Sequence, residues 1–326
     1  MDSMIYATSV FLTRAVILAG AALLMPACAS GPVVEPPAVI HERAHSGGSV
    51  VSFSQTGDLL ASGGWEGTVR LWRLPGGEQV SHWRDHSDSV NGIVFLEGDR
   101  GLVSAGYDGW LVKRDLAGNV YQRIATPAAI MHMVADPGRD RVLTGHTDGV
   151  VRLWRLGDFS LLQERVLHRG AVKAVAIDPR STRYASGGAD GRVFVWEEGG
   201  EVLSLEAPPV DPWTLAFSLD GKWLSGGSWF RLFRWNLRDG AFTSLPTQHH
   251  GIIKSVEYVS GDVLATISRQ TDSSVYFLDP ASGETLRRFQ RHDLCGGDIS
   301  VSPDGRYLAT TSDDASVRIW LLESKK

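Results

Sequence analysis

A segment of about forty residues recurs seven times along this chain. The clearest copies end in similar strings, such as LLASGGWEGTVRLW at residues 59–72 and RYASGGADGRVFVW at residues 183–196. The last residues of the seven copies lie at positions 72, 114, 154, 196, 235, 278 and 320, so neighbouring copies are 39 to 43 residues apart. A repeat of this length at a fixed period predicts an array of identical structural units rather than one unrepeated core.

Each copy contains short apolar or alternating stretches that are separated by Gly, Asp or Ser. In the fourth copy these stretches are residues 172–177, 184–186, 193–196 and 202–207, and the Ala-Asp-Gly sequence at 189–191 is typical of a tight hairpin turn. Four short antiparallel strands in a repeat of this length are typical of propeller blades. The sequence therefore predicts an all-β fold, a seven-bladed β-propeller with four-stranded blades.

The copies resemble WD-repeat β-propellers, whose repeats carry His before the first strand, Ser or Thr on the second, Asp in the turn and Trp on the third. The fourth and seventh copies match this pattern completely, with His168, Ser186, Asp190 and Trp196 in one and His292, Thr310, Asp314 and Trp320 in the other. The remaining copies depart from the pattern, with Glu66 for Asp in the first, Arg114 for Trp in the second, Thr126 for His in the third, Pro208 and Trp229 for His and Asp in the fifth, and Leu278 for Trp in the sixth.

The resemblance implies that each set of four residues is a buried tetrad, in which Asp accepts from His, His bonds the hydroxyl and the hydroxyl meets the indole N–H. The four residues belong together because a buried polar group without a partner costs about 1–3 kcal/mol. The recurring Ser, His and Asp residues are therefore predicted to be structural rather than a hydrolytic triad. Neither a metal nor a cofactor is expected, since the sequence contains no HExxH, paired CxxC or GxxxxGK motif.

The N-terminal part of the chain supplies a candidate closing strand. The seventh copy ends at Trp320, and too few residues follow it in this sequence for a fourth strand. Residues 38–43, AVIHER, are similar to the fourth strands of the other copies. We expect this N-terminal strand to pair into the last blade and remove an open sheet edge. The propeller is then predicted to span residues 38–323, with residues 324–326 as a tail.

An apolar stretch precedes the repeats. Residues 15–25 read AVILAGAALLM, which is too short to cross a bilayer and is typical of a secretory signal peptide. The following LMPACAS resembles a bacterial lipobox, which implies cleavage before Cys28 and lipidation of that cysteine. We therefore expect a signal peptide at 1–27, a Pro-rich tether at 28–37, and a lipoprotein of the bacterial cell envelope, anchored in the outer membrane and facing the periplasm. A signal peptide cut after Ala27 or Ala29, which gives a soluble secreted protein, is the alternative.

Composition excludes several classes of protein. Hydrophobic residues make up 43% of the chain, which is too many for a disordered protein. Lys and Arg number 32 against 37 Asp and Glu, so a basic nucleic-acid-binding surface is not expected. The two cysteines cannot form a disulfide framework.

The remaining candidate site residues lie at positions that the resemblance places on the top face of the propeller. They are Trp65, Asn91, Tyr107, Lys173, Trp213, Trp229, Arg231 and Lys254. Trp, Tyr and Arg dominate binding hot spots, so these residues indicate a non-catalytic protein–protein interaction scaffold whose partner is another protein. For Trp213 and Trp229 the alternative is that they fill space left by the incomplete fifth tetrad. The alternative function is a hydrolase, a lactonase or a small-ligand binder that uses the central channel, although the top-face positions contain no ring of carboxylates.

Overall fold

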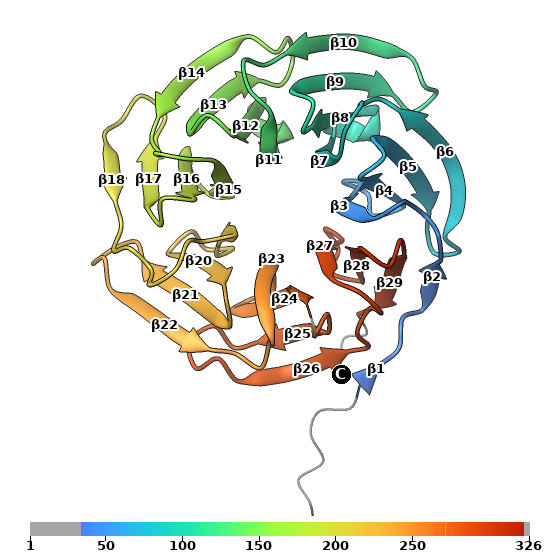
Figure 1. Ribbon diagram of the computed structural model, residues 1–326. Coiled ribbons are helices and arrows are strands. Elements are labelled where there is room, and N and C mark those ends of the chain that lie inside the picture. Colours follow the sequence, from blue (N-terminus) through green and yellow to red (C-terminus); the bar gives the residue numbers. More distant parts are fainter. Residues whose placement is uncertain (1–33, 271, 323–326) are drawn as a thin grey trace, which may run out of the picture. The chain divides into compact units, whose positions relative to one another are not determined.

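The computed structural model describes residues 34–270 and 272–322. Within these residues the strands form seven sheets arranged around a central axis as the blades of a propeller (Figure 1). Six sheets have four strands, and the sixth blade carries a fifth strand. The predicted all-β, seven-bladed propeller with antiparallel four-stranded blades is confirmed.

The first three blades follow one another from the N-terminal side, each from its innermost to its outermost strand. Blade one consists of β3 (Gly48–Phe53), β4 (Leu59–Gly64), β5 (Thr68–Arg73) and β6 (Glu78–Arg84). Blade two consists of β7 (Val90–Phe95), β8 (Gly101–Gly106), β9 (Trp110–Asp115) and β10 (Val120–Ala125), with the short 3-10 helix η1 (Glu97–Asp99). Blade three consists of β11 (Ile130–Asp136), β12 (Arg141–His146), β13 (Val150–Arg155) and β14 (Leu161–Val166), with the 3-10 helix η2 (Pro137–Arg139).

The next three blades repeat the same order. Blade four consists of β15 (Val172–Ile177), β16 (Arg183–Gly188), β17 (Val193–Glu197) and β18 (Val202–Ser204). Blade five consists of β19 (Thr214–Phe217), β20 (Trp223–Ser228), β21 (Arg231–Asn236) and β22 (Phe242–Pro246). Blade six consists of β23 (Gly251–Ser260), β24 (Val263–Gln270), β25 (Val275–Leu278) and β26 (Thr285–Phe289).

The seventh blade joins the two ends of the described chain. It consists of β27 (Gly296–Val301), β28 (Tyr307–Ser312), β29 (Val317–Leu321) and the N-terminal strand β2 (Val39–His41), which pairs antiparallel with β29. The predicted closure by residues 38–43 is confirmed. Because β2 covers the outer edge of β29, that edge cannot template pairing with another chain.

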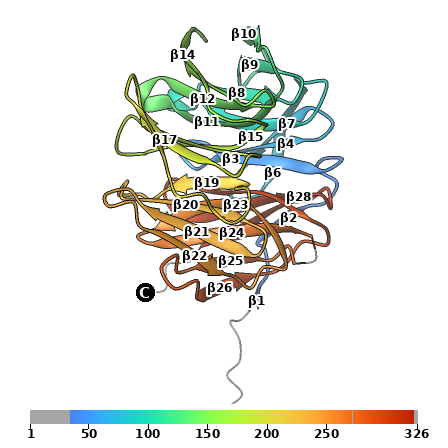
Figure 2. The same ribbon diagram turned by 60° about the vertical axis from the view of Figure 1, so that its left-hand side comes forward.

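A second N-terminal strand ties blade six to blade seven. β1 (Val34–Glu35) pairs parallel with β26, and Figure 2 shows the two strands side by side. The Glu35 carboxylate binds the Arg287 guanidinium at 2.6 and 3.0 Å, and the Glu35 carbonyl accepts from the indole of Trp320 at 3.3 Å. The sequence predicted a tether without regular structure at this point. The structure differs because β26 offers a free edge that even two residues can extend.

Hydrophobic cores lie between neighbouring blades rather than inside one central core. Each of the seven blade-to-blade interfaces in the described ring has its own cluster of buried apolar residues. Between blades four and five, for example, Val193 packs with Phe217 and Trp235. The cluster between blades five and six is among the smallest and is built around Ile253 and Tyr258. This layout makes each blade depend on both neighbours for burial of its two faces.

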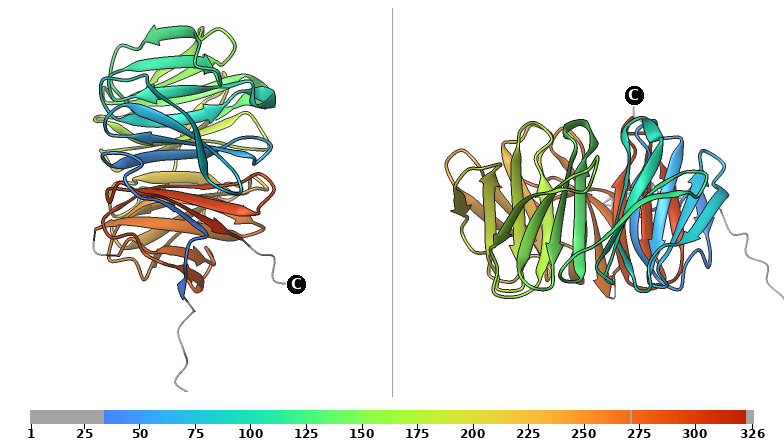
Figure 3. Two further views of the ribbon diagram at one scale, coloured as in Figure 1. Left: turned by 90° about the vertical axis from the view of Figure 1, so that its right-hand side faces the viewer. Right: turned by 90° about the horizontal axis from the view of Figure 1, so that it is seen from above.

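Because consecutive strands of a blade are antiparallel, the loops that connect them lie alternately on two opposite faces of the propeller. Turns that join the second and third strands, and loops that lead from a fourth strand to the next blade, lie on one face, which we call the top face. The remaining turns lie on the opposite face, called the bottom face. Figure 3 shows the strands of the blades running between these two faces.

Several predicted segments lie outside the described residues. They are the signal peptide at 1–27, Cys28 and the first part of the tether, and the tail at 324–326. In residues 34–270 and 272–322, no helix has the length and apolar character needed to span a bilayer.

Candidate functional site

The His, acid and hydroxyl residues of blades one, two, four and seven lie in the predicted relay. In blade four, His168 bonds Asp190 at 2.9 Å and Ser186 at 2.9 Å, and in blade seven His292 bonds Asp314 at 3.2 Å and Thr310 at 2.7 Å. Blade one places Glu66 where the pattern has Asp, and this carboxylate bonds His45 at 2.8 Å. Burial alone would raise the pKa of Glu66, but the bonds from His45 and from the Ser46 N–H lower it to about 2. These bonded groups hold each first strand against the turn of its own blade.

The indole groups depart from the predicted relay in the two blades whose sequence pattern is complete. The buried Nε1 of Trp196 has no hydrogen-bond partner in the described chain, although Ser186 is present. Trp320 donates to the carbonyl of Glu35 instead of to Thr310. Trp72 of blade one does reach Ser62, at 2.8 Å. The sequence pattern therefore fixes the residue types but not the partner of the indole.

Blade three fills the missing His position from within its own second strand. His146, two residues after Thr144 on β12, bonds the Thr144 hydroxyl at 2.8 Å and the Ala128 carbonyl at 3.0 Å. Trp154 donates to the same hydroxyl at 2.8 Å. Thr126, which stands at the expected His position, bonds the backbone instead. Burial lowers the pKa of His146 to about 4, so the imidazole is neutral at pH 7.

In blades two and five, residues outside the pattern contact members of the incomplete tetrads, whereas in blade six His249 bonds Thr266 of the pattern at 2.8 Å. In blade five the Ser225 hydroxyl bonds the Tyr258 hydroxyl of blade six at 2.7 Å. In blade two Arg114, which replaces Trp, pairs with Asp85 and lies 4.6 Å from the centroid of the Trp83 ring. The partners in these contacts, Tyr258, Asp85 and Trp83, do not occupy positions of the tetrad pattern.

Side-chain hydrogen bonds join the innermost strand of each blade to the innermost strand of the next blade, or to the loop that leads into it. We call these contacts ties. The ties run from Ser49 to the Val90 carbonyl, from Asn91 to the Ile130 carbonyl, from the Val175 N–H to His132, from Lys173 to Asp211, from the Val256 N–H to Thr214, from Ser255 to Asp298 and from the Val51 N–H to Asp298. An innermost strand has a free edge toward the axis, and most of these ties satisfy its unpaired backbone groups. All seven junctions of the ring have such a tie.

The residues of these ties surround the central channel, and several of them line it. A cavity of about 190 Å³ opens toward the top face, and we call it the channel mouth. A second cavity, of about 370 Å³, continues below it. Both are lined by Val50, His132, Thr214, Ser255 and Asp298, so they form one passage along the axis.

Ionisable groups in the passage have pKa values that burial shifts strongly. Burial raises the pKa of Glu257 to about 8, with a further contribution from the charge of Asp298. Burial also raises the pKa of Asp298 and lowers that of Lys254. The pKa of His132 falls to about 4 because of burial and the nearby charge of Lys254. At pH 7 Glu257 and His132 are therefore mainly uncharged.

The structure separates the predicted top-face residues into two groups. Asn91 and Lys173 serve as ties between blades, and the Arg231 guanidinium bonds Ser244 at 2.6 and 2.7 Å. Trp213 is partly buried, with the Nζ of Lys173 at 3.8 Å and that of Lys254 at 5.4 Å from its ring centroid. Asn91, Trp213 and Lys254 line the channel mouth, and Lys173 contacts Trp213. Arg231, on β21, instead bonds the outermost strand β22 of its blade.

The second group is exposed. Trp65 and Tyr107 are 44% and 42% exposed on the turns after β4 and β8. Trp229 is partly buried, whereas its neighbour Phe230 is 48% exposed and Leu294, in the loop before β27, is 56% exposed. Phe230 and Leu294 are not among the residues that the sequence predicted, because neither occupies a position that the repeat pattern singles out.

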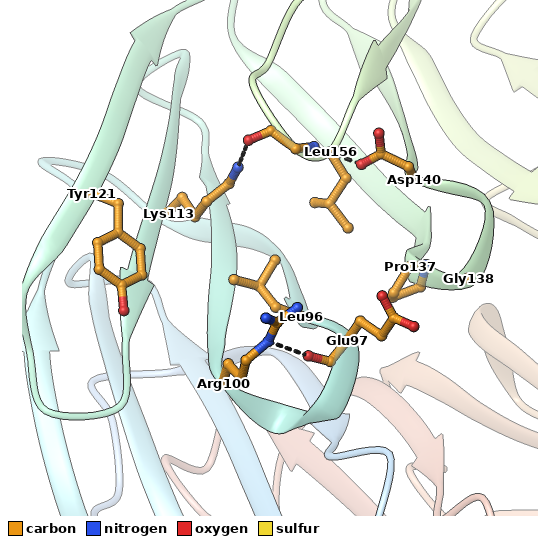
Figure 4. Close-up of a pocket in the computed structure, with 10 residues that line it drawn as sticks. Leu96, Glu97, Arg100, Lys113, Tyr121, Pro137, Gly138, Asp140 and Leu156 are labelled. Carbon is orange, nitrogen blue, oxygen red and sulfur yellow. Dashed lines mark hydrogen bonds between the residues drawn. The ribbon is translucent and has the colours of Figure 1, made fainter.

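A further pocket lies between blades two and three. It has a volume of about 440 Å³ and is lined by Leu96, Glu97, Arg100, Lys113, Tyr121, Pro137, Gly138, Asp140, Leu156 and Gly157 (Figure 4). The Lys113 ammonium donates to the Gly157 carbonyl at 2.6 Å, and Arg100 donates to the Glu97 carbonyl at 3.0 Å. Its cationic groups are thus occupied within the pocket wall. In the described part of the chain, no group of three or more His, Cys, Asp or Glu residues is arranged to hold a metal ion.

The family model described as "WD domain, G-beta repeat" matches residues 38–73, 160–197 and 283–320. The chain is 23% identical over 284 residues to "Protein tipD" of Dictyostelium discoideum, which covers 83% of this chain and 39% of that protein. It is 34% identical over 73 residues to "WD repeat-containing protein 91 homolog" of the same organism, 22% of this chain and 10% of that protein. It is 43% identical over 61 residues to "Nuclear distribution protein PAC1" of Arthroderma benhamiae, 19% of this chain and 13% of that protein. The chain thus spans well under half the length of these relatives.

Proposed function

We propose that this WD-repeat propeller is a non-catalytic scaffold that binds another protein through its top face. WD-repeat propellers generally serve as platforms for protein interactions, and the matched repeats together with the seven-bladed fold support that class. A fold alone does not define a function, so the partner surface has to follow from this chain's own exposed side chains.

The observation that carries the proposal is the placement of exposed aromatic side chains. Among the described residues, the large aromatic side chains that are exposed are Trp65, Tyr107, Tyr121 and Phe230. Three of these four lie on top-face turns, and Leu294 adds an apolar side chain to the same face. Aromatic side chains on loops of a rigid scaffold favour a contact surface, because they offer a large apolar area at little cost in conformational entropy.

The backbone at Phe230 strengthens this interpretation. Phe230 has φ of 59°, the left-handed region that favours glycine, and a bulky residue is strained there by about 1–2 kcal/mol. Hydrogen bonds of 3.0 Å from the Phe230 N–H to Gly251 and from the Thr247 N–H to Phe230 hold it in place. The chain therefore keeps an exposed aromatic ring at a position where glycine would be more stable.

Comparative affinity capture tests the proposal. Wild type, the Trp65→Ala/Tyr107→Ala double variant and a Leu219→Ala control would be expressed at equal levels in the native host. Leu219 is 41% exposed on the bottom face and is thus a matched control. We expect one or a few proteins to be retained by wild type and by the control, and to fall at least tenfold with the double variant. Equal capture by all three chains would contradict the proposal.

We further propose that the chain is exported and anchored through an acylated Cys28. The support is the apolar stretch at 15–25 and the sequence LMPACAS that follows it. Only residues 29–33 separate Cys28 from β1, and five extended residues span at most about 18 Å. An anchored propeller would then lie close to the membrane surface. Intact mass of the membrane fraction, with and without Cys28→Ala, distinguishes an acylated chain that begins at Cys28 from a cleaved chain without lipid.

The alternative, a hydrolase or small-ligand binder in the channel, depends on the acids of the passage. Asp298 accepts from Ser255 at 2.8 Å and from the Val51 N–H at 3.1 Å, and Glu257 accepts from the Val301 N–H at 3.0 Å. These contacts give both acids a role in joining blades. Turnover of any ester or lactone that Asp298→Asn abolishes would favour the alternative.

A further inference from the structure

Lys254 on β23 differs from the other cations of the channel mouth. Lys173 pairs with Asp211, and Arg269 pairs with Asp313 at 2.9 Å. Lys254 has neither an ion pair nor a hydrogen bond among residues 34–270 and 272–322. Its nearest described aromatic contact is the ring of Trp213, 5.4 Å from Nζ. The ammonium thus belongs to a partly buried cation whose direct partner the described residues do not supply.

The acids nearest to this cation are already occupied. Both oxygens of Asp298 accept hydrogen bonds, from Ser255 and from the Val51 N–H. Asp313 binds Arg269. Burial disfavours the charged form of Lys254 and lowers its pKa, so an anion that reached Nζ would restore a favourable environment for the charge. The charge of Lys254 is therefore free to act on a group that enters from the top face.

The size and walls of the channel mouth restrict that group. The cavity of about 190 Å³ is lined by Trp65 and Trp213 as well as by Lys254. Asp298 and Asp313 also line the cavity and repel any anion, and they repel a phosphate dianion about twice as strongly as a monoanion. A carboxylate carries a single charge, and a short aliphatic stem can pack against the indole rings. The chemistry that fits is a carboxylate on one or two methylene groups.

We propose that the channel mouth binds the carboxylate of a Glu or Asp side chain of the protein partner, with Lys254 as the cation that holds it. The inference rests on the proposed function, because Trp65 belongs to both the top-face surface and the wall of the cavity. The carboxylate binds through charge-assisted hydrogen bonds from Nζ, and no covalent step is involved. Lys254 would thereby select an acidic residue at the centre of the interface.

Short blocked peptides provide the test without the partner itself. The probes are acetyl-Gly-Glu-Gly-amide, its Gln analogue and sodium acetate, at constant ionic strength. The readout is the NMR resonance of the Trp213 indole N–H, assigned by its loss in Trp213→Phe. We expect a saturable shift with the Glu peptide, at least tenfold weaker binding of the Gln peptide, and at least tenfold weaker binding of the Glu peptide by Lys254→Met.

Two further variants keep the test decisive. Lys254→Arg retains the charge and should retain binding, which separates loss of charge from loss of folding. Lys222→Met removes an exposed lysine elsewhere and should bind as wild type does. Equal binding of the Glu and Gln peptides, or unchanged binding by Lys254→Met, overturns the inference.

The remaining outcomes separate the source of the carboxylate and the two proposals. Acetate that binds as tightly as the Glu peptide, without dependence on Trp65, overturns the assignment to a partner side chain and indicates a site for a free carboxylate. Capture of a partner that requires Trp65 and Tyr107 but is unchanged in Lys254→Met overturns this inference and leaves the proposed function standing. If the peptide binds through Lys254 but partner capture is unchanged in the Trp65→Ala/Tyr107→Ala variant, the proposed function is contradicted and this inference stands.

Discussion

The tetrad hydroxyls show that one hydrogen-bonding role can be filled from different places in the chain. Ser62 forms a hydrogen bond with His45, which lies in the loop before its blade, whereas Thr144 forms one with His146 on the same strand. Either arrangement pairs a hydroxyl that is completely buried. The physical requirement is a satisfied polar group, and the repeat position is only the commonest way to meet it.

Two buried indoles test this requirement. Trp72 and Trp196 are 4% and 3% exposed, but only Trp72 donates a hydrogen bond, to Ser62. Both Trp→Phe variants lose similar apolar area. We expect Trp72→Phe to destabilise the protein by about 1 kcal/mol more than Trp196→Phe, because it also removes a buried hydrogen bond. Urea denaturation of the two variants measures the difference, and equal losses would contradict the assignment.

Glu257 predicts a pH dependence of stability. Its pKa is about 8 in the folded chain, well above the usual value of 4.5, so the folded state holds a proton that the unfolded state releases. Stability from this group is present below pH 4.5 and is lost as pH rises through 8. We expect Glu257→Gln to remove about 1–3 kcal/mol of decline in unfolding free energy between pH 5 and 8. Parallel pH profiles for wild type and Glu257→Gln would show that the carboxyl ionises freely.

At the scale of the element, the innermost strands were predicted but the ties between them were not. Alternating apolar residues mark β15 clearly, because the period of a strand is local in sequence. The tie from Asp298 to Val51 joins positions 247 residues apart, and no local pattern reports it. The same limit explains β1, since two residues carry no periodic signal. His146 was not predicted as a tetrad residue because it lies on β12, two residues after Thr144, and not before the first strand, where the repeat pattern places its His.

The two N-terminal strands predict different consequences of truncation. A chain that begins at Pro36 lacks β1 and loses the bonds of Glu35 to Arg287, Trp320 and Gln290. We expect it to remain a monomeric propeller that is less stable by about 1–3 kcal/mol. Denaturant unfolding measures the loss, and an unchanged midpoint would show that β1 adds nothing.

Removal of β2 should have a different effect. A chain that begins at Glu42 lacks β2 and exposes the outer edge of β29. We expect it to self-associate through that edge, as light scattering after size-exclusion chromatography would detect. A monomer as stable as the chain that begins at Pro36 would contradict the role of β2 in closing the ring.

For the whole molecule, the sequence predicted the number of blades and their strand order, because the same pattern recurs in seven copies. It also predicted the closing strand, because residues 38–43 are similar to the fourth strands of the other copies. The candidate site was predicted less completely. Trp65 and Tyr107 are exposed as a contact surface requires, whereas Asn91 and Lys173 serve to join blades. Sequence position on a turn does not tell whether a side chain faces solvent or a neighbouring blade, because that depends on contacts between repeats.

The most direct test of a top-face scaffold is site-specific photocrosslinking in the native host. A benzophenone amino acid would replace Trp65, Tyr107 or, as the bottom-face control, Leu219. We predict that positions 65 and 107 crosslink to the same protein and that position 219 does not. Crosslinks from position 219 alone, or to unrelated proteins from each position, would contradict the proposal that this propeller presents its top face to one partner.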